Sequence, residues 1–264
     1  MDYSNLDLKF SNENAKTKKL RESGELVDNF LQDKRKIYSL DLLSGWTCPF
    51  ASECSSKVVE IGGLSPSGNP KVKVKDGART KFRCFSASQE ALMPTVYKRR
   101  KSNTDAIQSV KTAEEMAGIL QAKLPKNVGI VRIHVAGDMF NEEYFKAWLL
   151  LAQANPTVLF YAYTKSLRYW VNNMELVNSI PNIVLTASRG GREDHLIDTH
   201  NLREAVVVFS QEEADAKGLE IDSNDTHAAE PSKRNQSFAL LIHGTQPKGS
   251  EASKALQVLK AGAK

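Results

Sequence analysis

The hydrophobic positions of the chain change their spacing near residue 86. Before it, residues 37–43 alternate between apolar and polar in the manner of a β-strand, and 57–61 and 71–75 are expected to be two further short strands. After it, segments with apolar residues three and four positions apart, typical of amphipathic helices, alternate with short apolar runs. We expect strands in this second part at residues 128–135, 158–164, 183–188, 205–209, 219–221 and 238–242. We expect helices at residues 86–101, 142–154, 167–177 and 251–260, and Pro94 is expected to bend or restart the first of them. Two further helices are expected after the capping boxes at Thr112 and Ser210.

Strands that alternate with helices of ten or more residues predict βαβ units and a parallel sheet. No G-x-G-x-x-G motif follows the first strand, which argues against a Rossmann sheet. We therefore predict an α/β fold, a complete or partial (β/α) TIM-like barrel. The two strands at 57–61 and 71–75 predict a β-hairpin with lysines on its solvent face, inserted between the second and third cysteines.

The polarity of the chain suggests how it is divided. Residues 1–34 are polar and only weakly periodic, so we expect a flexible N-terminal arm. Residues 35–264 are expected to form a single barrel-like domain, in which 57–83 are the hairpin insertion. The polar stretch 224–236 is expected to be a loop.

Composition and charge narrow the class of protein. The chain of 264 residues is 41% hydrophobic and 25% charged, which is ordinary for a globular protein. It has no run of about eighteen apolar residues, and its first residues are polar and acidic, so we expect a cytoplasmic protein and no membrane partner. The net charge of +5 is spread out except for residues 98–101, Lys-Arg-Arg-Lys, which could contact phosphates or simply form a solvated helix end.

All three cysteines, Cys48, Cys54 and Cys84, lie in the first third of the chain. An odd number excludes a complete set of internal disulfides. Structural zinc usually takes four ligands, often in C-x-x-C pairs, whereas five residues separate Cys48 from Cys54. Three thiolates suit a [4Fe-4S] cluster that leaves one iron for another ligand. We expect these cysteines to bind such a cluster, with zinc or no metal as the alternatives.

The expected strand ends carry most of the unusual residues of the chain. In β/α barrels the loops at the C-terminal ends of strands build the site. Those ends carry Ser44, Gly45 and the cysteine loop, Gly137 and Asp138, Thr164 to Ser166, Ser188 to Arg192, Ser210 and Gln211, and His243 and Gly244. We therefore expect the cysteines to lie on one rim, beside a pocket.

Several of these residues are candidates for chemistry. Arg132 and His134 alternate with three apolar residues and are expected to point into the barrel lumen, where Arg132 either binds a ligand or pairs with a carboxylate such as Asp41. The candidate catalytic residues are His134, Asp138, Lys165 and Arg189. The candidate cofactor-binding residues are Arg132, His134, Gly137, Asp138 and Ser188, the last within a Gly-rich stretch that could bind an anion. For Asp138 the simpler alternative is a turn before a helix.

Three segments, 46–54, 132–140 and 160–165, resemble a bacteriophage family, the "gene product 88" domain proteins. The similarity extends from about Tyr38 to His243. It implies a phage-encoded protein that acts in the host cytoplasm, and it implies no particular reaction.

A three-cysteine loop directly after the first strand also resembles, more distantly, the radical S-adenosylmethionine enzymes. There, three cysteines hold a [4Fe-4S] cluster whose open iron binds S-adenosylmethionine, and a glycine-rich acidic turn binds its amino group. The resemblance implies that Cys48, Cys54 and Cys84 are the ligands and that Gly137 and Asp138 form the turn. The family spacing is C-x-x-x-C-x-x-C, and this chain departs from it because Cys84 lies beyond the hairpin.

Two functions are therefore expected. The first is a phage-encoded [4Fe-4S] protein that carries out redox or radical chemistry on a bound small molecule. The second is a non-catalytic module in which zinc or a cluster has a structural role and the basic surface contacts nucleic acid or a host protein.

Overall fold

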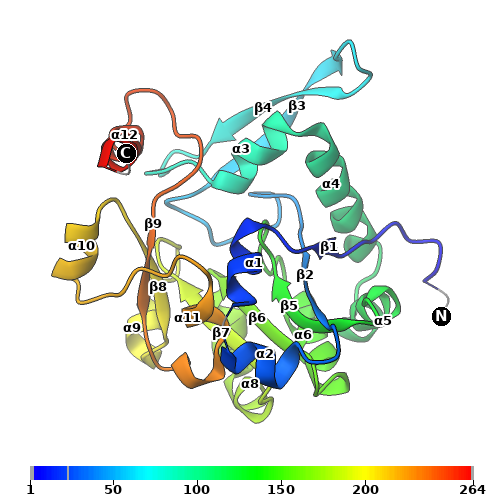
Figure 1. Cartoon of the computed structure of the whole chain (residues 1–264). Coiled ribbons are helices and arrows are strands. Elements are labelled where there is room, and N and C mark those ends of the chain that lie inside the picture. Colours follow the sequence, from blue (N-terminus) through cyan, green and yellow to red (C-terminus); the bar gives the residue numbers. More distant parts are fainter. Residues whose placement is uncertain (1–2, 23, 263–264) are drawn as a thin grey trace.

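The computed structural model describes residues 3–22 and 24–262. Its centre is a seven-stranded sheet in the order β1-β2-β5-β6-β7-β8-β9 (Figure 1). The strands of this sheet are β1 (Ser11–Asn12), β2 (Lys36–Leu40), β5 (Val128–Ile133), β6 (Leu159–Thr164), β7 (Ile183–Ser188), β8 (Glu204–Val208) and β9 (Phe238–Leu241). Only β1 is antiparallel to its neighbour, so the mostly parallel α/β sheet expected from the sequence is confirmed.

The six parallel strands follow one another in chain order, and each crossover carries helices. The helices that enclose the sheet are α3 (Phe85–Leu92), α4 (Pro94–Gln108), α5 (Ala113–Lys123), α6 (Glu142–Ala154), α7 (Leu167–Asn172), α8 (Met174–Ser179), α9 (His195–His200) and α10 (Gln211–Ala216). The edge strands β1 and β9 do not pair with each other, so over the described residues the sheet stays open and the complete barrel is not formed.

Local sequence signals explain where several helices begin. Pro94 occupies the first turn of α4 and ends α3 at the extended residue Met93, as expected. Thr112 and Glu115 form the capping box of α5, and the Asn141 side chain accepts a hydrogen bond from the Tyr144 backbone at the start of α6. The helix expected at 167–177 is instead two short helices, α7 and α8.

Two apolar clusters cover the two faces of the sheet. The first lies under α5 and α6 and includes Trp148 and Phe160, both fully buried. The second covers the opposite face, which would be the lumen of a barrel, and includes Tyr161 and Phe238. The helical residues Leu20, Leu26, Ala228 and Ala229 complete this second cluster, so the lumen face is filled by protein.

The N-terminal residues differ from the flexible arm that their polarity predicts. The short helices α1 (Ala15–Leu20) and α2 (Gly24–Phe30) lie on the lumen face, and Leu20 and Leu26 are fully buried there. β1 extends the sheet beside β2. The helices are only one to two turns long, too short to show a clear periodicity, and a few leucines hold them in place.

The stretch 224–236 is likewise not a simple loop. It contains α11 (Thr226–Ala229) and the 3₁₀-helix η1 (Pro231–Lys233), and Ala228 and Ala229 are fully buried in the lumen-face cluster. The stretch at 219–221 contributes only an isolated bridge from Ile221 to Ala239, not a strand. The last helix is α12 (Glu251–Gly262).

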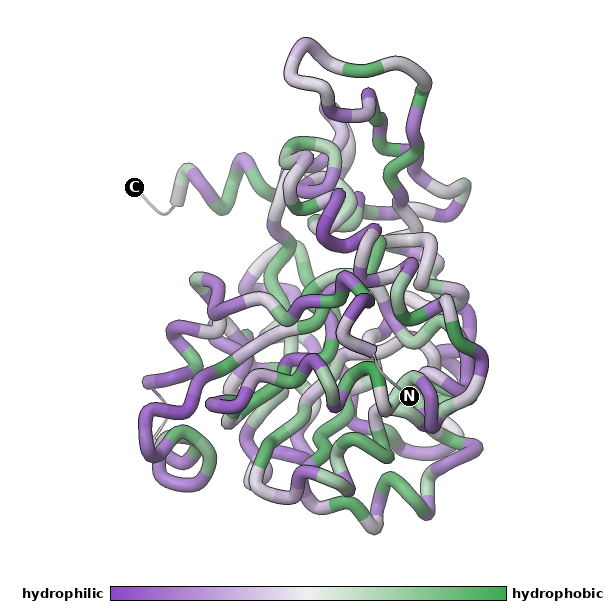
Figure 2. Tube along the Cα trace, turned by 90° about the vertical axis from the view of Figure 1, so that its right-hand side faces the viewer, coloured by the Kyte–Doolittle hydropathy of each residue, from purple (hydrophilic) through white to green (hydrophobic). Residues whose placement is uncertain are grey.

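The expected hairpin is present. Strands β3 (Ser56–Leu64) and β4 (Pro70–Asp76) form a separate antiparallel pair. Val58, Val72 and Val74 on one face of the pair pack against Leu43 and Tyr97. The far end of the hairpin stands clear of the main body in both views (Figures 1 and 2).

Candidate functional site at the carboxyl-terminal rim of the sheet

The loop that carries Cys48 and Cys54 runs across the C-terminal ends of the strands. The backbone N–H of Glu53 donates to the carbonyl oxygen of Gly190 over 2.9 Å, and that of Arg192 donates to Phe50 over 2.9 Å. These bonds flank a bridge between Ala51 and the loop after β7. The cysteine loop, which begins after β2, is therefore anchored three strands away.

The same loop packs closely on the end of β5. Gly137 has φ = +88°, and a β-carbon there would lie 2.7 Å from the Thr47 hydroxyl oxygen and 2.8 Å from the Leu42 Cβ. Only glycine combines this backbone conformation with so close an approach. The cysteine loop therefore packs directly against the backbone of Gly137.

The segment with Cys84 contacts the opposite edge of the sheet. The Arg83 backbone N–H donates to Gln246 Oε1 over 2.7 Å, and Gln246 Nε2 donates back to the Arg83 carbonyl over 3.0 Å. The Phe85 ring meets the His243 ring edge-on, with centroids 4.9 Å apart. The third cysteine thus reaches the rim from the β9 side, as the expected convergence on one rim requires.

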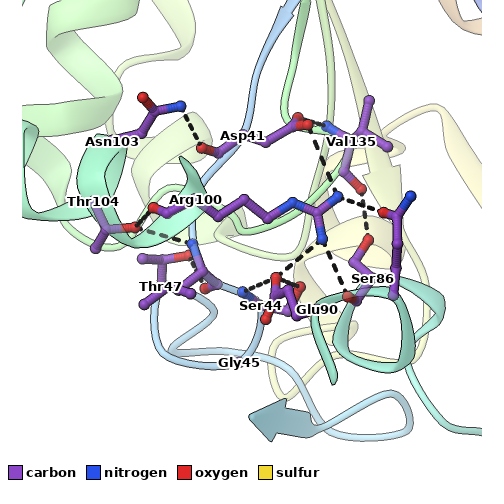
Figure 3. A network of polar contacts seen from close by, with 12 residues as sticks. Asp41, Ser44, Gly45, Thr47, Ser86, Glu90, Arg100, Asn103, Thr104 and Val135 are labelled. Carbon is purple, nitrogen blue, oxygen red and sulfur yellow. Dashed lines mark hydrogen bonds and ion pairs between the residues drawn. The ribbon is translucent and has the colours of Figure 1, made fainter. Parts of the chain in front are cut away.

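A buried polar network joins the two cysteine-bearing segments (Figure 3). Glu90 of α3 is fully buried, and its Oε1 accepts hydrogen bonds from the backbone and hydroxyl of Ser44 over 3.0 and 2.8 Å. Arg100 of α4 donates to the same oxygen over 3.1 Å and to the carbonyl of Ser86 over 3.1 Å. The turn before Cys48 and the helix after Cys84 are therefore held by one ion pair.

The network also reaches the sheet. Asp41 accepts a 2.7 Å hydrogen bond from the Val135 backbone and lies 3.9 Å from Arg100. The Ser86 hydroxyl donates to the Val135 carbonyl over 3.0 Å. Burial raises the pKa of the Glu90 carboxyl, and the nearby Arg100 charge and the Ser44 hydrogen bonds oppose that rise.

The three thiols are partly buried electrostatic neighbours. Burial raises the pKa of Cys48 well above its usual range, and Asp138, Cys84 and Cys54 raise it further. Burial, together with Cys54, raises the pKa of Cys84 to about 11. Backbone N–H groups point at two of the sulfurs, that of Gly45 at Cys48 over 3.4 Å and those at the start of α3 at Cys84.

These thiols are not gathered around a single point. Among the described residues, no group of three or more His, Cys, Asp or Glu side chains is arranged to hold a metal ion. A cleft of about 530 Å³ opens beside the cysteine loop. It is lined by Ala51, Ser52, Ser55, Gly77, Ala78, Arg79, Gly191 and Arg192. One side of the loop is therefore accessible to a small molecule.

Asp138 ties β5 to β6 at this rim. Its Oδ1 accepts hydrogen bonds from the Met139 backbone over 2.7 Å and the Thr164 hydroxyl over 2.6 Å, and its Oδ2 accepts from the Lys165 backbone over 2.8 Å. Burial raises the pKa of this carboxyl despite these bonds. Asp138 is thus more than a simple turn residue, and most of its accepting capacity is already used.

Lys165 forms hydrogen bonds with the loop after β7. Lys165 Nζ donates to the carbonyls of Ser188 and Arg189 over 2.7 Å each, and to the Ser188 hydroxyl over 3.0 Å. The backbone N–H groups of Gly190 and Gly191 both donate to the Asp194 carboxylate, over 2.8 and 2.9 Å. The anion that the Gly-rich stretch was expected to bind is therefore supplied by the protein.

Arg189 points away from the rim into an ion-pair cluster on the outside. Its guanidinium pairs with Glu204 and, over 2.7 Å, with Asp198. These carboxylates raise the pKa of Arg189, with the Glu204 hydrogen bond contributing most. In this arrangement Arg189 links β7, α9 and β8.

His134 does not point into the lumen as its place in the alternation predicts. β5 ends at Ile133, and His134 has φ = +68°, which turns its side chain toward the helix layer. Its Nε2 lies 3.0 Å from the Tyr144 hydroxyl oxygen, and its ring packs edge-on against Trp148. Burial lowers the pKa of His134 to about 3, so the imidazole is neutral at pH 7.

Arg132 does point to the lumen face, where its partner is Asp225 rather than Asp41. Arg132 Nη1 lies 2.6 Å from Asp225 Oδ2, and Lys16 Nζ lies 2.6 Å from Oδ1. The hydroxyls of Tyr161 and Tyr163 donate to the same carboxylate over 3.1 and 2.9 Å. Sequence reasoning missed Lys16 and Asp225, although a buried arginine beside two tyrosines signalled a missing carboxylate.

The charges of this lumen cluster stabilise one another. Burial favours neutral Asp225, but Arg132 and Lys16 outweigh it and hold the pKa of the carboxyl below its usual range. Burial likewise opposes the charge on Arg132, while Asp225 raises its pKa overall. Burial and Asp225 raise the pKa of both tyrosines well above the usual range.

In the basic run at 98–101, Lys98 is exposed, and the other three side chains have acidic partners. Arg100 is buried in the network described above. Arg99 pairs with Asp7 over 2.6 Å, and Lys101 pairs with Asp105 over 2.8 Å. The run lies in the interior of helix α4, so the solvated helix end expected as the simpler interpretation is not found.

The family profile described as gene product 88 matches residues 7–260. The chain therefore belongs to the gene product 88 family of bacteriophage proteins, as the three segments indicated. No curated protein and no solved structure matches it, so the resemblance to radical S-adenosylmethionine enzymes has no support from these comparisons. Within the described ranges, no helix is both long and apolar enough to cross a membrane.

Proposed function

We propose that this protein binds a [4Fe-4S] cluster through Cys48, Cys54 and Cys84 at the open end of a partial β/α barrel, in the cytoplasm of the infected host. The observation that carries the proposal is the convergence of the cysteine segments. One is anchored on β5 and β7 and the other on β9, and a buried ion pair joins them. Such a scaffold, built around the only three thiols, supports a shared ligand.

The residues at the rim suit a cluster better than a single ion. In a cubane each cysteine binds a different iron, so the sulfurs need not meet within the coordination sphere of one ion. The backbone N–H groups directed at Cys48 and Cys84 are of the kind that tunes cluster potentials. Zinc held by three thiols would require a closer arrangement and a fourth ligand.

The chain's own residues would hold and shield the group. Cys48, Cys54 and Cys84 would supply the ligands, and the Glu90–Arg100 pair would keep the two segments in register. A bound cluster supplies one-electron transfer. The cleft beside the loop, with Arg79 and Arg192 on its wall, gives a small-molecule partner access to this side of the rim.

The test is anaerobic purification of the full chain followed by iron, sulfide and zinc analysis. Brown protein with about four irons per chain supports the proposal. Cys48→Ala, Cys54→Ala and Cys84→Ala should each lose the iron, whereas Ser52→Ala in the same loop should keep it. A colourless protein with stoichiometric zinc, or full iron in all three cysteine variants, would overturn the proposal.

A second measurement separates electron transfer from radical chemistry. S-adenosylmethionine is added to the reduced, iron-loaded protein, and its paramagnetic resonance spectrum is recorded. A changed spectrum supports a radical enzyme. An unchanged spectrum supports electron transfer. That result would agree with the Asp138 carboxylate already accepting three hydrogen bonds from the protein instead of binding the amino group of S-adenosylmethionine.

A further inference from the structure

The two faces of the β3–β4 hairpin differ sharply in charge. Opposed residues of antiparallel strands share a face, and the structure pairs Lys57 with Lys75 and Val59 with Lys73. Lys71 lies two residues from Lys73 and so shares that face. The outer face of the hairpin, defined by Lys57, Lys71, Lys73 and Lys75, therefore carries four lysines.

The carboxylates of the two strands are turned to the other face, and each is already engaged. Glu60 accepts a 2.9 Å hydrogen bond from the Tyr97 hydroxyl. Asp76 accepts hydrogen bonds from Arg83 over 3.1 and 2.5 Å. None of the outer-face lysines has an ion-pair partner within the part of the chain that the structure describes. The outer face is thus cationic and uncompensated.

This arrangement costs stability. Like charges placed directly opposite on neighbouring strands destabilise a sheet, and Lys57 faces Lys75. The ammonium nitrogen of Lys57 lies 3.8 Å from the centre of the Trp46 ring, a cation–π contact that does not cancel its charge. Trp46 is itself 53% exposed at the border of this face, held by a 2.8 Å hydrogen bond from its indole to the Val58 carbonyl. A surface with unrelieved charge and an exposed aromatic ring suits an anionic partner.

The shape of the hairpin indicates which kind of anionic partner it fits. Its far end stands clear of the main body in Figures 1 and 2. Lysines two residues apart along β4 are spaced by roughly 6.6 Å, about the axial rise of two phosphates on one strand of B-DNA. A two-stranded ribbon also fits the DNA major groove, whereas that of duplex RNA is too deep and narrow.

We propose that the outer face of the β3–β4 hairpin binds the phosphate backbone of duplex DNA. The contact is sequence-independent, because the lysine ammonium groups meet phosphates, which carry no sequence information. Lys71, Lys73 and Lys75 lie on β4, outside the cysteine loop, and none of them is a proposed ligand of the cluster, so the two proposals can fail independently.

The experiment measures binding of the full chain to a 30-base-pair duplex by fluorescence anisotropy between 50 and 200 mM salt. The wild type is compared with a Lys71→Gln/Lys73→Gln/Lys75→Gln variant. Removing three phosphate contacts should lower the slope of log affinity against log salt by about 2.7. The wild-type affinity divided by the variant affinity should therefore be about 40-fold smaller at 200 mM than at 50 mM salt.

The matched control removes three exposed lysines elsewhere, at Lys248, Lys254 and Lys260, and should keep the wild-type slope. Because the hairpin substitutions relieve like-charge repulsion, the first variant should melt at or above the wild-type temperature, which excludes misfolding as the cause. Equal slopes for wild type and hairpin variant would overturn the proposal. Binding to vesicles with 30% phosphatidylserine but not to the duplex, or tighter binding to single strands, would overturn it as well.

Discussion

Gly137 approaches Thr47 so closely that a β-carbon at position 137 would lie 2.7 Å from the Thr47 hydroxyl oxygen. The contact joins the end of β5 to the turn just before Cys48. It makes the position of the cysteine loop depend on a residue without a side chain in a different strand.

Replacing Gly137 with alanine should therefore both strain the backbone and push the loop. We expect Gly137→Ala to lower the free energy of unfolding by about 3 kcal/mol, measured by urea denaturation. Gly218→Ala is the matched control, because Gly218 has φ = +65° but no atom within 4 Å of its added carbon. It should cost only about 1 kcal/mol. Equal losses at the two positions would show that the contact with Thr47 is unimportant.

The pair of Arg100 and Glu90 gives a second prediction. Arg100→Met would leave a fully buried carboxylate with only the Ser44 donors, which should cost about 3–5 kcal/mol of unfolding free energy. Lys101→Met changes the next residue of α4, whose ion pair is exposed, and should change stability by less than about 0.5 kcal/mol. Hydrogen exchange should be faster at Ser44 and Gly45 in the first variant only. Unchanged exchange there would contradict the role assigned to the pair.

The Asp225 carboxylate pairs with the side chains of Lys16 and Arg132 on the lumen face, so replacing it with a neutral group should lower the stability of the protein. Asp225→Asn leaves Lys16 and Arg132 without their carboxylate and should lower stability by about 3–5 kcal/mol at pH 7. Asp215→Asn, at an exposed position of α10, should have little effect.

The pH dependence of this loss has a definite sign. Because the pKa of folded Asp225 is lowered, its stabilisation is present above the unfolded value of about 3.9 and is lost as pH falls through the folded value. The difference between wild type and Asp225→Asn should stay constant from pH 8 to about 5 and close only in stronger acid. A difference that already closes near neutral pH would contradict this account.

His134 predicts a pH dependence in a different range. The folded pKa is about 3, against 6.5 for the unfolded chain, so the unfolded state binds the proton first. Stability should fall as pH drops below 6.5, by about 1.4 kcal/mol per pH unit from this residue. His134→Gln should remove that part of the slope between pH 6 and 4.5, and His195→Gln, at an exposed position, should not. Equal slopes in the wild type and His134→Gln would disprove the burial of a neutral imidazole.

Local signals in the sequence predicted much of the fold. The capping residues Thr112 and Asn141, and Pro94 at a helix start, act through neighbouring backbone groups and can be recognised directly. The hairpin follows from alternation and a Gly-rich turn. Closure of the barrel could not be predicted in this way, because it depends on whether the last strand meets the first, and here short N-terminal helices fill the lumen face instead.

The candidate site was predictable in outline for the same reason. Strand ends of a parallel sheet meet at one edge, so the meeting of the cysteine loop with Gly137 and the loop after β7 follows from topology. The side-chain partners do not follow, because Asp225 finds Lys16 and Arg132 across large sequence separations. His134 was misplaced because one residue with a positive φ reverses the alternation of a strand, and the sequence carries no sign of it.

The reciprocal hydrogen bonds between Arg83 and Gln246 join residues 163 positions apart. During synthesis on the ribosome, Cys48, Cys54 and Cys84 all emerge long before the residues that complete their surroundings. The rim therefore forms only after β9 has been made and docked. A fragment that ends before β9 would carry all three cysteines but would lack the contact of Gln246 with the segment that bears Cys84.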